Sequence, residues 1–299
     1  MHRTAPGRHR SPELTLAATA AANPEWAPWL RLLERAQSAT APPWVIEIGL
    51  VPERGDAPLL DQAVIAVDTE RLAAWTSDLL AAAAEEQPST IGTTPIGRAE
   101  AIALLEAAIA LDTDRLDDLA ERRGEDARRL AATMQLVAMP VLLAARARLA
   151  AEVPRGWGRG YCPVCGAWPA FAEVRGLERQ RRARCGRCAC DWRFDALHCP
   201  YCDERDHGQL TGLVVEGEEE TRRVDTCKQC NGYLKALATL MAVPDEQVPI
   251  VDLESVELDL VATERGFARP DAPAVVMRVA VHDRDAIATN SDGRKWLLS

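Results

Sequence analysis

The sequence predicts an α+β protein, with an α-helical N-terminal domain followed by two small four-cysteine metal modules. Two observations predict this fold class. Apolar residues recur at helical spacing over most of residues 12–153, and all nine cysteines fall between Cys162 and Cys230. Apolar residues at intervals of three and four are typical of helices, and closely paired cysteines are typical of metal sites. The two halves of the chain are therefore expected to differ in architecture.

Composition limits the classes of function. The 299-residue chain is 47% hydrophobic, enough for a sizeable core, and carries a formal net charge of −10. A general nucleic-acid-binding protein would show a basic surface, so the acidic charge argues against one. No apolar run reaches the about 18 residues that a membrane span requires. We therefore expect neither a nucleic acid nor a membrane as a partner.

The N-terminal residues 1–11 form a basic tail that is expected to be disordered and to lead into a helix. The alanine-rich stretch at 14–22 is reminiscent of a signal-peptide core, but Thr15 and Thr19 interrupt it. The sequence thus favours a cytoplasmic protein, in which thiols stay reduced and available to a metal.

Residues 12–153 are predicted to form the helical domain. Thr69 is expected to cap one helix and Asp112 to begin another, while Trp44–Leu50 is a short strand or an extended link. Pro140 is expected to kink the last long helix. The apolar stripes that should form the core include Leu30, Leu33, Leu72, Leu79, Leu105, Leu130, Met134 and Val137.

Eight cysteines form four CxxC pairs after a Gly- and Pro-rich linker at 154–160. The pairs are Cys162/Cys165, Cys185/Cys188, Cys199/Cys202 and Cys227/Cys230. Nineteen residues separate the first two pairs, a spacing inside the usual range for four-cysteine metal sites, and 24 separate the last two, which is slightly longer. Disulfides would require an oxidising compartment, and a redox CxxC would occur once, so metal ligation is the favoured interpretation.

Each metal module is predicted to be a small antiparallel sheet that holds two cysteine pairs, over residues 160–195 and 196–240. The spacing favours one metal shared by the first two pairs and another by the last two, although a cross-braced arrangement remains open. Such units bury little apolar surface. The metal must therefore supply folding free energy, on the order of 10–16 kcal/mol for structural zinc in small peptides.

Other side chains in this region are weaker candidates. An arginine run between the first two pairs is either a docking patch for an acidic partner or a solvated strand face that offsets thiolate charge. The ninth cysteine, Cys190, is either a packed bystander or a substitute ligand, and His198 and His207 flank the third pair. The arginines proposed for partner binding are Arg179, Arg181, Arg182 and Arg184.

Residues 250–299 are expected to form a C-terminal helix and tail. An amphipathic helix is predicted over 251–266, with Val256, Leu260 and Leu253 facing inward and Gly266 at its C-cap. A strand is predicted over 274–281.

An ordered set of motifs makes a family resemblance specific. The motifs are YCPVCGAWP at 161–169, CGRCACDW at 185–192, HCPYC at 198–202, DTCKQCNGYLK at 225–235 and DLESVELDLVATERGFARP at 252–270. Together they resemble the formate dehydrogenase accessory protein FdhE family over about residues 155–270. The family landmarks fall on the eight paired cysteines and on Gly166, Pro169, Trp192, Tyr233, Leu234, Lys235, Asp252 and Asp259. The chain departs from the family in having Val251 where an aspartate is usual, and in carrying Cys190.

The resemblance implies a helical domain followed by two rubredoxin-like or zinc-ribbon-like modules. It implies iron at two sites, whereas the spacing alone supports zinc equally. It further implies a cytoplasmic maturation factor, not an enzyme, whose partner is the catalytic subunit of a molybdenum- or tungsten-dependent formate dehydrogenase. The alternatives are a zinc-ribbon nucleic-acid-binding protein and a thiol redox protein that uses Cys190.

Overall fold

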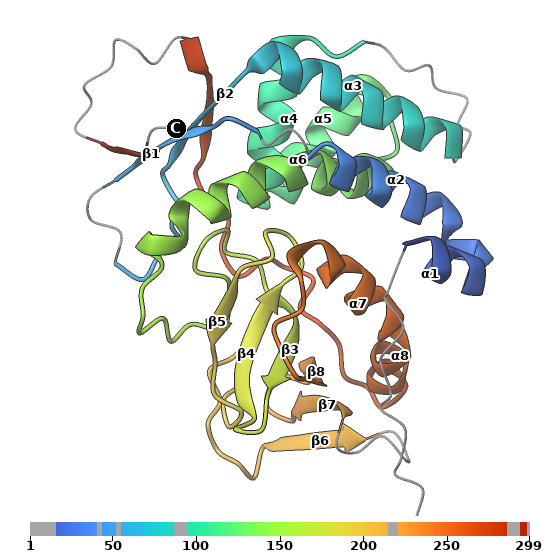
Figure 1. The fold of residues 1–299 in the computed structure, drawn as a ribbon, viewed down its shortest axis with the longest axis vertical. Helices are drawn as coiled ribbons and strands as arrows, with labels where there is room; N and C mark the ends of the chain where they lie inside the picture. Colours follow the sequence, from blue (N-terminus) through green and yellow to red (C-terminus); the bar gives the residue numbers. More distant parts are fainter. Residues whose placement is uncertain are drawn as a thin grey trace, which may run out of the picture.

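The computed structural model describes residues 16–40, 44–51, 55–86, 95–214, 221–285 and 294–297. The expected basic tail at 1–11 lies outside these residues. The described part forms a helical layer above a six-stranded sheet, with a second, smaller sheet beside the helices (Figure 1). The α+β class expected from the sequence is confirmed.

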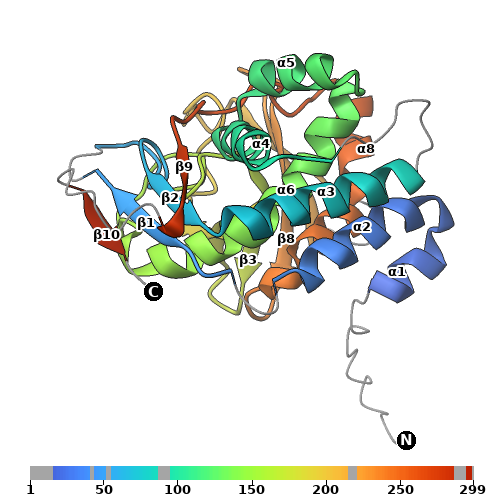
Figure 2. The ribbon, with the colours of Figure 1, turned by 90° about the horizontal axis from the view of Figure 1, so that it is seen from above.

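The helical layer is built around α6 (Ala127–Leu149), which lies beneath α3 and α4, on the side of the layer that faces the six-stranded sheet (Figures 1 and 2). The other elements are α1 (Leu16–Ala22), η1 (Pro24–Trp26), α2 (Ala27–Ser38), α3 (Thr69–Glu86), α4 (Arg98–Ala110), α5 (Thr113–Arg123) and η2 (Ala150–Glu152). Pro140 lies inside α6. The predicted core residues, from Leu30 to Val137, are all buried in one cluster.

Aspartates begin three of these helices by accepting hydrogen bonds from otherwise unpaired backbone N–H groups of the first turn. Asp112 accepts from the N–H of Arg115 at 3.0 Å, and Asp126 accepts from that of Arg129 at 2.8 Å. In α3 the cap is Asp68, which accepts from the N–H of Arg71 at 3.0 Å. The prediction that Thr69 caps this helix was therefore wrong by one residue.

The small sheet joins strands from the N-terminal half of the chain to strands from its C-terminal end. Its order is β10-β1-β2-β9, from β1 (Glu47–Leu50), β2 (Val64–Val67), β9 (Ala280–Asp283) and β10 (Lys295–Leu297). β9 runs parallel to β2, and β10 pairs antiparallel with β1. The N-terminal half is therefore not wholly helical. The predicted strand at 274–281 overlaps β9 only at its last two residues.

The six-stranded sheet has the order β5-β4-β3-β8-β7-β6. One half comprises β3 (Pro169–Arg175), β4 (Gln180–Cys185) and β5 (Asp191–Arg193), and the other β6 (Leu210–Val214), β7 (Arg222–Cys227) and β8 (Tyr233–Thr239). Each half is antiparallel, as predicted for each module. The two halves join through parallel pairing of β3 with β8, so the modules share one continuous sheet.

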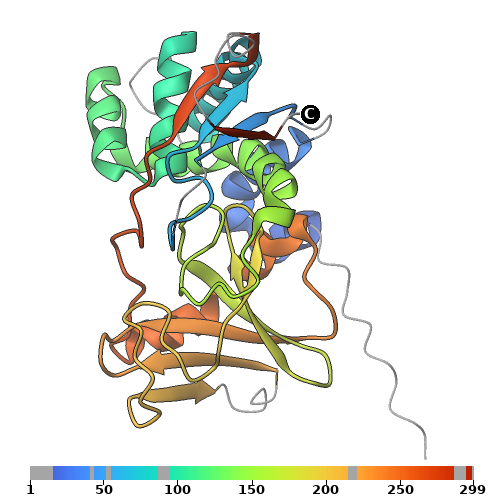
Figure 3. The same cartoon turned by 90° about the vertical axis from the view of Figure 1, so that its left-hand side faces the viewer.

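Two short helices, α7 (Val248–Glu254) and α8 (Val256–Glu264), pack beside the six-stranded sheet, preceded by η3 (Asp245–Gln247). A single helix had been predicted here, and Ser255 divides it. The break changes which residues of the second helix face the sheet. Leu258 is fully buried, whereas Leu260, which was predicted to face inward, is 58% exposed. Gly266 does terminate α8, with a φ of 84°. From there the chain runs back to the helical layer along one side of the molecule (Figure 3).

Among the described residues, the stretch Ala127–Glu152 is long and apolar enough to cross a membrane by composition. However, 61% of its most apolar window is buried inside the protein. This stretch is apolar because α6 is the central helix of the core.

Candidate metal centres

Four loops of the same construction position the eight paired cysteines. In each, the residue directly after the second cysteine has a left-handed backbone: Gly166 (φ 69°), Ala189 (55°), Asp203 (63°) and Asn231 (54°). In each, the N–H of the first cysteine donates to the carbonyl five residues later, at 2.8–2.9 Å. Gly, Asp and Asn tolerate this backbone conformation well, so three of the four loops are encoded locally.

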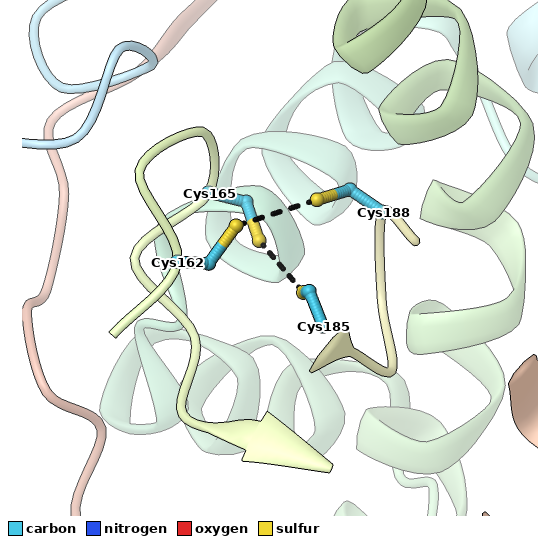
Figure 4. Close-up of side chains that lie close together, drawn as sticks. All are labelled: Cys162, Cys165, Cys185 and Cys188. Atoms are coloured by element: carbon cyan, nitrogen blue, oxygen red, sulfur yellow. Dashed lines mark hydrogen bonds between the residues drawn. The ribbon is translucent and has the colours of Figure 1, made fainter. Parts of the chain in front are cut away.

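The first two loops bring four thiols together. The Sγ atoms of Cys162 and Cys188 are 3.5 Å apart, as are those of Cys165 and Cys185, and all four lie within 4.8 Å of one another (Figure 4). A tetrahedral metal with bonds of about 2.3 Å to sulfur has S···S edges of about 3.8 Å. The observed spacing matches this geometry, and we call this group site 1.

Site 1 is buried between the sheet and the helical layer. All four cysteines belong to the same apolar cluster as the helices. The backbone of Leu59 and Leu60 donates to the carbonyls of Pro163 and Val164 in the first loop. In the second loop, the Arg187 guanidinium donates to carbonyls at the end of α4. Site 1 therefore connects the six-stranded sheet to the N-terminal unit, by which we mean the helical layer and the small sheet.

The last two loops form site 2, which comprises Cys199, Cys202, Cys227 and Cys230. The Sγ atoms of Cys199 and Cys230 are 3.6 Å apart, and those of Cys202 and Cys227 are 3.7 Å apart. Unlike site 1, this group lies at the surface, with Cys202 and Cys230 exposed. Both sites unite loops that are consecutive in sequence, so the cross-braced arrangement is not the one found.

Burial gives these thiols unequal acidities. In site 1, burial raises the pKa of the Cys162 and Cys188 thiols, whereas hydrogen bonds from neighbouring thiols, chiefly that of Cys162, lower the pKa of Cys165. In site 2, burial raises the pKa of Cys230 to about 11. The four thiols of one group cannot all ionise at such short mutual distances unless a cation compensates their charge. Each group can therefore bind a metal ion, and doing so would release protons.

The difference in exposure predicts a difference in metal release. With both sites loaded, we expect a chelator to remove the metal of site 2 at least about tenfold faster, because site 1 opens only when buried structure opens. The release is measured with a coloured chelator and assigned with Cys202→Ser, which should remove the fast phase. Two equal rates would contradict this prediction.

Gly160, which lies just before the first loop, packs closely against the third loop. A Cβ at this position would lie 1.9 Å from the carbonyl oxygen of Pro200, in the third loop. Gly160→Ala must therefore displace backbone, and we expect it to lower the free energy of unfolding by about 1–3 kcal/mol. Gly156 in the same linker has no atom within 4 Å of such a Cβ, so Gly156→Ala is the control. Equal unfolding midpoints for the two variants would refute this packing.

The other candidates of this region lie outside both four-cysteine groups. Cys190 is 4% exposed, and its thiol donates to the carbonyl of Asp191 at 3.8 Å. His198 is buried, stacks on Phe194 with ring centroids 4.5 Å apart and pairs with Asp203. His207 is exposed, and it belongs to neither four-cysteine group of the described residues.

The arginine run does not form one exposed patch. Arg181 is 9% exposed and pairs with Asp225, and Arg184 is 2% exposed and pairs with Asp245 at 2.8 Å. Alternate residues of β4 point to opposite faces of the sheet, so the run is divided between two ion-pair groups. Arg182, which pairs with Asp191, is half-buried, and Arg179 is exposed. The burial of Arg181 and Arg184 removes them from the predicted docking surface.

A buried ionic cluster, to which the sequence reasoning gave no role, fixes α7 and α8 to the sheet beside site 2. Lys235 on β8 is fully buried, and its Nζ lies 2.7 Å from an Asp252 oxygen and 2.8 Å from an Asp259 oxygen. The Tyr233 hydroxyl donates to Asp259 at 2.8 Å, and Arg269 pairs with Asp259 at 2.9 Å. We call Tyr233, Lys235, Asp252, Asp259 and Arg269 the Lys235 cluster. A lysine inside an alternating apolar strand was the signal that could have revealed it.

The fold and the two sites define an α+β protein that places one four-thiol group in its core and another at its surface. A match was found to the crystal structure of the FdhE protein from Pseudomonas aeruginosa, with a TM-score of 0.52 and 25% identity, covering 88% of this chain and 93% of that one. The chain is therefore similar in fold and in sequence to an FdhE protein over most of its length.

Curated relatives carry the same family name. An FdhE homolog of Stutzerimonas stutzeri strain A1501 is 35% identical over 119 residues, and one of Aquifex aeolicus strain VF5 is 34% identical over 119 residues. These matches cover 39% and 38% of this chain and 38% and 40% of the relatives, so the chain spans about two fifths of their length. Protein FdhE of Escherichia coli O127:H6 is 27% identical over 208 residues, which are 65% of this chain and 63% of that one. No protein-family model matches the chain.

Proposed function

We propose that the protein is an accessory protein needed for formate dehydrogenase activity, and that it acts in the maturation of that enzyme without catalysing a reaction itself. The observation that carries this proposal is the surface position of site 2 in a chain whose fold matches an FdhE protein over most of its length. A four-thiol group has no open coordination position for a substrate, so it suits a structural or docking role better than catalysis.

Each site is proposed to hold one iron ion in a rubredoxin-like module, with zinc as the alternative. Both metals accept tetrahedral sulfur coordination, and the S···S distances of 3.5–3.7 Å suit either. Elemental analysis and an absorption spectrum distinguish them. Two irons per chain with thiolate-to-iron charge-transfer bands support iron, and two zincs without visible bands support zinc.

The proposed partner is the catalytic subunit of a molybdenum- or tungsten-dependent formate dehydrogenase, met in the cytoplasm. The docking surface is proposed to be centred on the exposed cysteines of site 2. Arg179 and Arg182 are the members of the predicted arginine patch that remain accessible to a partner.

The test uses a bacterial strain that lacks its own FdhE-family protein. The wild-type chain is expected to restore formate dehydrogenase activity and to capture the catalytic subunit, whereas the double variant Cys202→Ser/Cys230→Ser should do neither. Cys190→Ser is the matched control, because this thiol belongs to neither four-cysteine group. Full activation by the double variant would refute docking through site 2, and loss of activation in Cys190→Ser alone would favour the thiol redox alternative.

A further inference from the structure

A cavity of about 490 Å³ lies where the end of α6 and the turn after it face the β4–β5 hairpin, with Cys190 in its lining. Its walls include four arginines: Arg146 and Arg155 from the helical side, and Arg182 and Arg193 from the hairpin. None of the eight cysteines of sites 1 and 2 lines it. Its volume lies within the range of about 300–1,000 Å³ that is usual for small-molecule sites.

The cavity is strongly basic in a chain of net charge −10. Asp191 is the one acidic residue among its lining residues, and it pairs with Arg182. Arg146 pairs with Asp245 at 2.8 Å. Arg155 and Arg193 are exposed at the cavity and form no side-chain hydrogen bond or ion pair within the described part of the chain. Two of the four guanidinium groups thus have all their donors available.

The register of the hairpin places like charges side by side. In the antiparallel pairing of β4 with β5, Arg182 lies directly opposite Arg193. Like charges at such positions destabilise a sheet. Asp191 pairs with Arg182 and also with Arg175 and Arg184, but not with Arg193. An anion bound between the two guanidinium groups would remove this repulsion, and planar guanidinium groups suit phosphate and carboxylate oxygens well.

Two tryptophans give the cavity a fixed apolar wall. The indole N–H of Trp157 donates to the carbonyl of Tyr161 at 2.8 Å, and that of Trp192 donates to the carbonyl of Arg159 at 3.1 Å. Both polar tips are therefore already used, which leaves recognition to the arginines. We propose that this cavity binds a small molecule with two or more anionic oxygen groups, either phosphates or carboxylates, and that Arg155 and Arg193 provide the main contacts.

The experiment is calorimetric titration of the metal-loaded full chain with propanediol bisphosphate, with isophthalate as the dicarboxylate probe and neutral propanediol as the blank. We expect saturable binding of at least one anion that weakens as salt is added. The double variant Arg155→Gln/Arg193→Gln should weaken that binding at least about tenfold, since each good charged contact contributes substantially to affinity. Because both side chains are exposed, the unfolding temperature of this variant should stay close to that of the wild type.

Arg179→Gln is the matched control, because Arg179 is an exposed arginine in the turn between β3 and β4, outside the cavity. It should change the affinity less than about twofold. Binding of the bisphosphate alone would assign the site to phosphates, and binding of isophthalate as well would extend it to carboxylates. The proposal is overturned if neither anion binds saturably, or if Arg179→Gln weakens binding as much as the double variant.

Discussion

Cys165→Ser is expected to destabilise the whole described fold, whereas Cys202→Ser should affect only the sheet around site 2. Both replace the second cysteine of a CxxC loop, so both should lower the metal content from two ions to one. The difference lies in what surrounds each thiol. Cys165 is buried in the cluster shared with the helices, and Cys202 is exposed.

The expected size of the effect follows from the metal's share in folding. Structural zinc in small domains contributes on the order of 10–16 kcal/mol, and a site inside a larger core should contribute part of this. Loss of site 1 also leaves three thiols in a buried space shaped for a cation. We expect Cys165→Ser to lower the free energy of unfolding by several kcal/mol, and Cys202→Ser by much less at the global transition.

Hydrogen exchange provides the measurement, with metal content determined in parallel. In Cys165→Ser, amides of α4 and α6 should lose protection together with those of the sheet, because Arg187 and the first loop bond site 1 to the N-terminal unit. In Cys202→Ser, protection of α6 should be unchanged. Equal loss of α6 protection in both variants would contradict the connecting role of site 1.

The cysteine groups were predictable because the information is local. A CxxC loop needs a tight turn and a residue that accepts a left-handed backbone, and Gly166, Asp203 and Asn231 are visible in the sequence as such residues. Consecutive loops then meet because short antiparallel strands join them. The sequence could not say which site would be buried, since this depends on α4 and α6, which are distant along the chain.

The errors have non-local causes. The small sheet pairs β9 and β10 with strands more than 200 residues earlier, and no local pattern carries such pairing. The arginine run was interpreted as either a docking patch or a solvated strand face, whereas strand alternation sends Arg181 and Arg184 to different faces and both are buried. The helix predicted over 251–266 begins three residues earlier, at Val248, and the break at Ser255 shifts its buried position from Leu260 to Leu258.

Asp259→Asn should be the most destabilising substitution outside the cysteines. Lys235 is fully buried, and Asp259 is one of its two anionic partners, so the variant leaves the cluster with excess positive charge. Removing one partner from a buried ion pair costs about 3–5 kcal/mol. Asp259 also accepts the Tyr233 hydroxyl and pairs with Arg269, so α8 should loosen from the sheet beside site 2.

Chemical denaturation with unchanged metal content is the measurement, and Asp78→Asn is its control. Asp78 pairs with Arg35 at 2.6 Å, but both side chains are nearly half exposed, so its loss should cost about 0–1 kcal/mol. Lys235→Met combined with Asp259→Asn should recover part of the stability lost in Asp259→Asn alone, because no buried lysine then lacks its partner. If the free energy of unfolding lost in the double variant equals the sum of the losses in Lys235→Met and in Asp259→Asn, the charges of Lys235 and Asp259 are not coupled. The Lys235 cluster would then hold α8 by packing alone.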